Sequence, residues 1–252
     1  MRSAKSLSLG LSAALSALSV PALAWAAPAA PAVALEEMRP ITLVVILALA
    51  ALLPFAFMTL TAFVKISTVL QIVRGAIGAQ GVPSNSVIMA LAGALTLVAM
   101  APVGDKIAAR AAPLWSGKGV PDTVVLVERG VEAVREPMRD FLKANASDEE
   151  RMRFLDVAKR ARAPEERAGV GPDDLTVLVP AFVVTELSDA FAVGFLIYLP
   201  FLVIDLVVSN LLLALGMQMM SPTQVSLPFK LLLFVATGGW GLLARSLVSG
   251  YR

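Results

Sequence analysis

The sequence lacks both cysteine and histidine, and only 16% of its 252 residues are charged. The missing cysteine excludes disulfides and thiolate nucleophiles. With histidine also missing, Cys/His zinc sites, histidine-ligated haem and Ser-His-Asp triads are excluded too. Most common enzyme chemistries are therefore ruled out, and we expect no catalytic residues, no cofactor and no metal. The net charge of +2 gives no general attraction for nucleic acid, so no nucleic-acid partner is expected.

Apolar residues are abundant instead. They make up 58% of the chain, and the mean hydropathy is +0.79. Soluble domains contain roughly 45–50% apolar and about 25% charged residues, so this composition lies outside their range. The composition predicts a membrane protein that is not an enzyme.

The charges divide the chain into blocks. Residues 105–174 hold 13 basic and 14 acidic residues, so this middle segment is polar but nearly neutral. It is flanked by two apolar blocks, residues 41–104 and residues 175–252. The pattern predicts an all-α protein in which apolar helical hairpins flank a polar helical middle segment.

The first 26 residues have the three parts of a secretory signal peptide. Two basic residues precede the apolar stretch 7–23, and an Ala-x-Ala sequence follows at 24–26. The alternative is an uncleaved first membrane helix. Residues 27–40 are rich in alanine and proline, which predicts a flexible linker.

If residues 1–26 are a signal peptide, the mature chain begins at Ala27. N-terminal sequencing, or the intact mass of the membrane-extracted protein, checks this cleavage site. Recovery of a chain that still carries residues 1–26 contradicts it.

Within the first apolar block, residues 41–64 are uncharged and long enough to cross about 30 Å of hydrocarbon. We expect Pro54 to bend this helix, and we expect a second helix over residues 87–100. Export of the N-terminus would place Lys65 and Arg74 on the cytoplasmic side, in agreement with the positive-inside rule.

Two helices are expected in the polar segment. Apolar residues recur at helical spacing from Val127 to Phe141, which predicts an amphipathic helix. Ser147 followed by Glu150 is a capping-box pattern and predicts the start of a second helix, which Pro164 ends.

Several charged residues lie within otherwise apolar sequence, where a charge needs a partner, a water-filled path or a protein interior. They are Lys65, Arg74, Glu186, Asp189, Asp205 and Lys230. One interpretation is a proton or ion relay that uses Glu186 and Asp205. We favour the structural interpretation, in which these residues form charge pairs or subunit contacts, because no histidine and no second acid accompany Asp205.

Residues 216–222 combine three methionines with the Gly, Ser and Pro that favour a loop. A loop carrying Met217, Met219 and Met220 offers a deformable, uncharged surface, suited to closing around a peptide of any sequence. The alternative is a helix end whose methionines fill the core.

Three stretches, in this order, resemble the core motifs of the FliP/SctR family of type III secretion export apparatus proteins. They are residues 53–78; residues 180–187 with 194–206; and residues 216–222 with 226–234 and 239–240. The resemblance covers about 53–104 and 175–250. The sequence of residues 208–218 is more similar to the injectisome (SctR) branch than to the flagellar branch.

The resemblance implies a pore-forming core subunit of the export gate that passes unfolded proteins across the bacterial inner membrane. Hydropathy predicts a multi-pass protein, with periplasm-facing parts, and the resemblance implies a pentameric ring. Its partners would be SctS-like and SctT-like subunits, SctU/SctV-like export components and unfolded secreted proteins. The family's methionine gasket falls on Met217, Met219 and Met220, with Gln218 interrupting the methionine run.

Other functions stay open on sequence alone. A flagellar export subunit of the same family is one, because a cleavable signal peptide is more typical of flagellar members. A proton-coupled small-solute transporter would use Glu186 and Asp205. A membrane enzyme lacks any convergent catalytic set.

Overall fold

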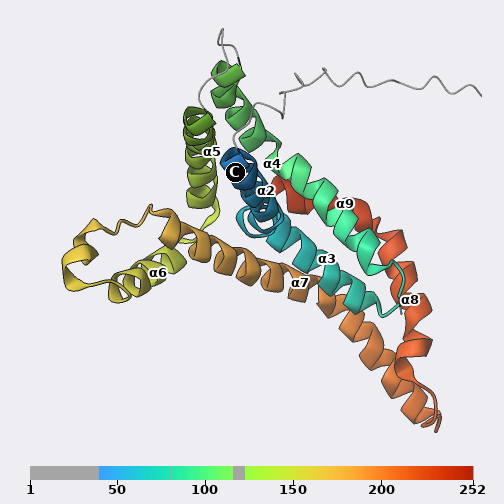
Figure 1. Ribbon diagram of the computed structural model, residues 1–252. Coiled ribbons are helices and arrows are strands. Elements are labelled where there is room, and N and C mark those ends of the chain that lie inside the picture. The colour runs from blue at the N-terminus through green and yellow to red at the C-terminus, as the bar shows by residue number, and fades with distance from the viewer. Residues whose placement is uncertain (1–39, 80, 116–122, 252) are drawn as a thin grey trace, which may run out of the picture. The chain divides into compact units, whose positions relative to one another are not determined.

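The computed structural model describes residues 40–79, 81–115 and 123–251, and every regular element in this part of the chain is helical (Figure 1). This confirms the predicted all-α class. The elements are α2 (Pro40–Leu60), α3 (Phe63–Ile77), α4 (Asn85–Trp115), α5 (Thr123–Asn145), α6 (Asp148–Arg160), the 3₁₀ helix η2 (Pro164–Gly169), α7 (Leu175–Ala214), α8 (Pro222–Ala236) and α9 (Gly239–Ser249).

The chain divides into two units at Val45, and the packing given below is that within Ile46–Arg252. The predicted signal peptide and all but the last residue of the predicted linker lie outside the described residues.

The first apolar stretch does not form one helix to Val64. It breaks after Leu60, and α3 leaves at an angle of 64° to the end of α2. The Thr61 hydroxyl donates to the Phe57 carbonyl and accepts from the Phe63 N–H, so one side chain closes α2 and opens α3. Pro54, where we expected the bend, lies inside α2.

Helix α4 is longer than expected. It runs through Pro102 and continues past the predicted 104/105 block boundary to Trp115. Its first half packs on α3, and its second half meets α5 through Val103.

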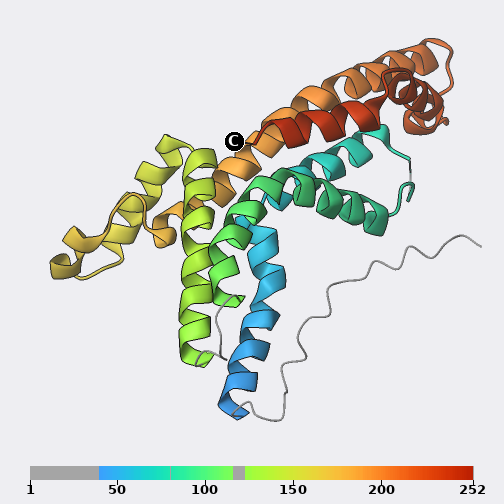
Figure 2. The same cartoon turned by 90° about the horizontal axis from the view of Figure 1, so that it is seen from above.

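The 40-residue helix α7 is the central element of the fold. Its middle packs against α3, where buried Ile66, Val69, Leu70 and Val73 form the main core. Its first turns contribute Leu178 and Phe182 to a second core shared with α4 and α5. Figure 1 shows α3 lying between α7 and α4, with α9 running alongside α4, and Figure 2 shows α5 beside α4.

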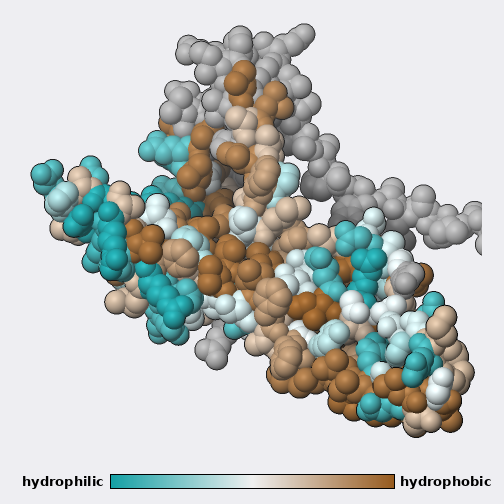
Figure 3. Space-filling view, turned by 90° about the horizontal axis from the view of Figure 1, so that it is seen from below, coloured by the Kyte–Doolittle hydropathy of each residue, from teal (hydrophilic) through white to brown (hydrophobic). Residues whose placement is uncertain are grey.

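The polar segment folds back on the start of α7. Ser147 caps α6 by accepting from the Glu150 N–H at 3.2 Å, which confirms the capping prediction. Asp173, just before α7, pairs with Lys143 of α5 at 2.6 Å and Arg151 of α6 at 2.8 Å. The hydrogen bond from Lys143 holds the pKa of the Asp173 carboxyl below its usual value. Figure 3 shows that the α6 end of the molecule is largely hydrophilic.

The valine stripe of α5 is only partly buried. Phe141, at its C-terminal end, lies in the core, whereas Val131 and Val134 remain exposed. With Leu60, Leu175 and Val179 they line an open apolar hollow.

The last apolar stretch bends between α8 and α9 by 58°. The break lies at Gly238, whose φ of 62° is left-handed, and not at the prolines. Pro222 occupies the first turn of α8, where its missing N–H costs nothing, and Pro228 lies inside that helix.

Two helices in the described part are long and apolar enough to cross a membrane, α4 over 85–114 and α7. The α2–α3 and α8–α9 pairs meet the same test when each bent pair is counted as one span. The chain is therefore a membrane protein with two to four candidate spans.

Helix α7 approaches α3 closely at Gly194. A Cβ added there would lie 2.5 Å from Ile72 Cδ1 and 3.2 Å from Ile72 Cβ, so the two helices must separate to accept it. We expect Gly194→Ala to destabilise the chain by about 1–3 kcal/mol. Thermal unfolding of the detergent-purified protein measures the loss.

Gly93→Ala is the matched control, since nothing lies within 4 Å of an added Cβ at that position of α4. It should be neutral or slightly stabilising, because alanine is the better helix former. Equal melting temperatures for the two variants would show that the α3–α7 contact is not tight.

Candidate functional site

The first charge cluster lies where α3 begins, against the middle of α7. Lys65 Nζ is 2.9 Å from Glu186 Oε1 and 3.0 Å from Asp189 Oδ2. Glu186 and Asp189 share one face of α7, and one lysine therefore bridges both carboxylates. The side chain of Glu186 is fully buried, whereas that of Asp189 is 54% exposed.

The chain's C-terminal end completes this cluster. The Tyr251 hydroxyl donates to Glu186 Oε2, and the Tyr251 ring lies under the ammonium of Lys65, 5.0 Å from ring centroid to Nζ. The cluster thus joins α3, α7 and the segment after α9.

A second ion pair ties α7 to α8. Lys230 Nζ is 2.6 Å from Asp205 Oδ2 and also donates to the Ala76 carbonyl at 3.1 Å. Ser226 Oγ donates to the other carboxylate oxygen of Asp205 at 2.6 Å. The lysine side chain is only 4% exposed. One buried lysine therefore fastens the C-terminal end of α3 to the α7–α8 hairpin.

The structure pairs five of the six charged residues named from the sequence, Lys65 with Glu186 and Asp189, and Asp205 with Lys230. Both acids considered for a relay are thus paired with lysines. Arg74 is half-buried near the end of α3, and no ion pair involves it among the described residues.

The methionine segment is a loop at the tip of the α7–α8 hairpin. Helix α7 ends in a Schellman motif: Gly216 has φ 73°, and the N–H of Met217 donates to the Leu212 carbonyl at 2.9 Å. Met219 is fully exposed, and Met217 and Met220 are 41% and 44% exposed. In the isolated chain these methionines do not fill the core.

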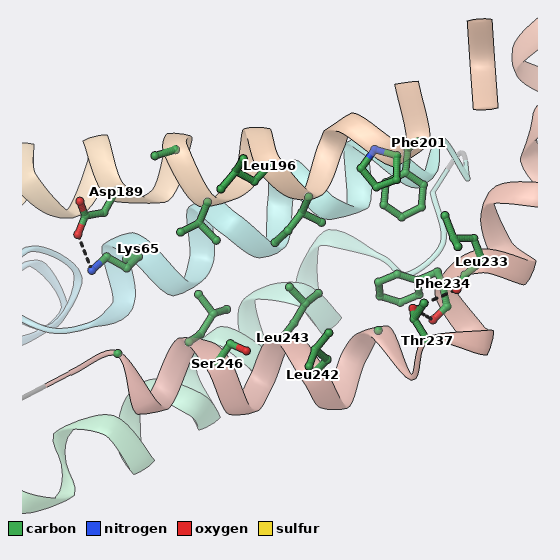
Figure 4. A pocket seen from close by; sticks show the side chains of 17 residues that line it. Lys65, Asp189, Leu196, Phe201, Leu233, Phe234, Thr237, Leu242, Leu243 and Ser246 are labelled. Carbon is green, nitrogen blue, oxygen red and sulfur yellow. Dashed lines mark hydrogen bonds and ion pairs between the residues drawn. The ribbon is translucent and has the colours of Figure 1, made fainter. Parts of the chain in front are cut away.

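An apolar groove runs between α7 and the α8–α9 arm, with a cavity volume of about 820 Å³ (Figure 4). Lys65 and Asp189 lie at one end, and Phe201, Leu233 and Phe234 lie at the other. A long apolar groove with one charged end suits a helix or another amphiphilic group, and not a small polar substrate.

Sequence analysis missed two residues of these sites. Ser226 lies one helical turn before Lys230, so helical spacing alone gave a signal for it. Tyr251 gave none, because its partner Glu186 is 65 positions away. Among the described residues, no group of three or more acidic side chains has metal-binding geometry.

Comparison with known proteins gives a consistent result. The pattern of the FliP family matches residues 46–247. The hypersensitivity response secretion protein HrcR of Ralstonia nicotianae is 43% identical over 211 residues, which cover 84% of this chain and 97% of that protein.

Two further relatives are similar over the same share of the chain. The Yop proteins translocation protein R of Yersinia pestis is 42% identical over 215 residues and covered over 96% of its length. The virulence protein YscR of Salmonella typhimurium is 39% identical over 219 residues and covered over 97%.

Proposed function

The chain belongs to the FliP family, and we propose that it is a pore-forming core subunit of a type III secretion export gate in the bacterial inner membrane. In this role it is not an enzyme. It would assemble as a ring with SctS-like and SctT-like subunits and pass unfolded proteins along the ring axis.

The observation that carries the proposal is the exposed methionine loop at the tip of a hairpin that is locked at its base. Asp205, Ser226 and Lys230 join α7 to α8 below the loop, and Ala76 joins the hairpin to α3. A rigid base presents the three methionines in a fixed place. Their thioether chains remain deformable and uncharged, as a seal around varied peptides requires.

Exposed apolar surface supports assembly. Phe191, Phe195, Leu199, Val203 and Leu206 of α7 are all exposed in the single chain. A surface of this kind needs lipid or neighbouring subunits to cover it. The groove between α7 and the α8–α9 arm is a second uncovered apolar surface.

The names of the relatives favour the injectisome branch. They concern hypersensitivity response secretion, translocation of Yop proteins and virulence. Secretion of virulence proteins is therefore favoured over flagellar assembly.

Affinity purification in mild detergent tests this function. A tagged chain should co-elute with SctS-like and SctT-like subunits, and its deletion should abolish secretion without loss of the other subunits. Two results together would refute the proposal. The tagged chain would elute alone from cells that contain the partner subunits, and secretion would continue after the chain is deleted.

A further inference from the structure

We propose that Tyr251 is a positioning residue for the buried charge cluster: its hydroxyl fixes the Glu186 carboxylate, and this contact locks the end of the chain onto α3 and α7. The expected effect on assembly of the export gate rests on the proposed function. The contact between Tyr251 and Glu186 does not, because it lies within the single chain.

Four separate contacts hold the Tyr251 side chain. Besides Glu186 and Lys65, the hydroxyl lies 3.3 Å from the carbonyl oxygen of Ala62, in the break between α2 and α3. The ring stacks on Phe141 of α5, with centroids 6.1 Å apart and planes at 25°. A single side chain thus touches the α2–α3 break, α3, α5 and α7.

Glu186 needs this hydroxyl because its two carboxylate oxygens have different partners. Oε1 faces the ammonium of Lys65, and Oε2 accepts from Tyr251. Within the described residues, no other side chain donates to Oε2. A fully buried carboxylate oxygen without a hydrogen-bond donor destabilises the fold, because nothing offsets the free energy of its desolvation.

Tyr251 stays close to the end of α9. Helix α9 ends at Ser249, and the Tyr251 N–H still donates to the Val248 carbonyl at 3.5 Å. Val248 and Tyr251 also line a smaller pocket with Lys106 of α4 and Asp140 of α5.

Burial and the adjacent Glu186 carboxylate raise the pKa of the Tyr251 phenol far above its ordinary value of 10. The charged groups that face it are Lys65, Glu186 and Asp189, with Lys106 and Asp140 at the neighbouring pocket. Ionisation of the phenol would place a second negative charge beside a buried carboxylate. The phenol therefore reports directly on Glu186.

The first experiment is an ultraviolet titration of the purified chain. The sequence has two tyrosines, so Tyr198→Phe leaves Tyr251 as the only phenol. We expect no phenolate absorbance at about pH 11 while circular dichroism shows a folded chain. Glu186→Gln in this background should lower the titration midpoint by at least about one pH unit.

Asp156→Asn, which removes an exposed carboxylate on α6, should leave the midpoint unchanged. A midpoint near 10 in the folded parent, or no response to Glu186→Gln, overturns the proposal. Tyrosine that serves only as packing would give this second result.

A second measurement applies if Glu186→Gln fails to fold. Tyr251→Phe keeps the ring and removes only the hydroxyl, and it should reduce the recovered assembly roughly ten-fold. Tyr198→Phe is the matched control, because no hydrogen bond of its hydroxyl occurs among the described residues, and it should assemble normally. Equal assembly of the two variants also overturns the proposal.

These results are separable from failure of the proposed function. If the partner subunits never co-elute, the proposed function is wrong. The titration of the purified chain still decides whether Tyr251 holds Glu186.

Discussion

Replacing Met217, Met219 and Met220 together by alanine is expected to leave the complex assembled but to let ions leak through the closed gate. The loop is exposed in the single chain, and its hairpin is held by Asp205 and Lys230, outside the substituted residues. We therefore expect the ring to assemble without the methionine side chains. A hydrophobic constriction closes by excluding water, and shorter side chains widen it enough to admit water.

Membrane conductance and native-gel assembly should be measured on the same variant. We expect a several-fold rise in resting ion conductance with unchanged assembly. Gln218→Met is the opposite change: it removes the one polar side chain among the methionines and should tighten the seal or leave it unchanged. An assembled ring with undiminished ion tightness would exclude the methionines from the gate, and loss of assembly without a leak would indicate that they pack against neighbouring subunits.

The second large effect is expected from Asp205→Ala, which should abolish the oligomer. It leaves the buried ammonium of Lys230 without its counter-ion and costs about 3–5 kcal/mol. Ser226 loses its acceptor as well. Native gels after detergent extraction measure the loss. Asp156→Ala is the matched control, because its pair with Arg160 is exposed on α6 and is worth at most about 1 kcal/mol.

The swap Asp205→Lys with Lys230→Asp should restore part of the oligomer. Recovery is incomplete because Lys230 also donates to the Ala76 carbonyl, and an aspartate at that position would face the carbonyl with a second acceptor. If Asp205→Ala instead assembles normally while secretion stops, a relay role for Asp205 gains support over a structural one.

Residue types alone were enough to identify the class of the protein. Composition and the absence of cysteine and histidine indicated a helical membrane protein without common catalytic groups, because burial of apolar surface depends on residue type. Local signals were also sufficient where partners are close in sequence. The Ser147 cap needs only Glu150, and the turn at Gly216 needs only a residue that accepts a positive φ.

Which charges meet, and where the helices bend, became visible only in the folded chain. Lys230 donates to the carbonyl of Ala76, 154 positions away, and the Tyr251 hydroxyl lies near the carbonyl of Ala62, 189 positions away. No rule of sequence spacing predicts contacts over such distances. The bend at Thr61 depends on a hydroxyl that hydrogen-bonds to both flanking helices, and the bend at Gly238 depends on a left-handed glycine. Pro54 and Pro228, in contrast, lie inside helices. A buried charge pairs with a group that lies close to it in the folded chain, because pairing at short range offsets the cost of desolvation.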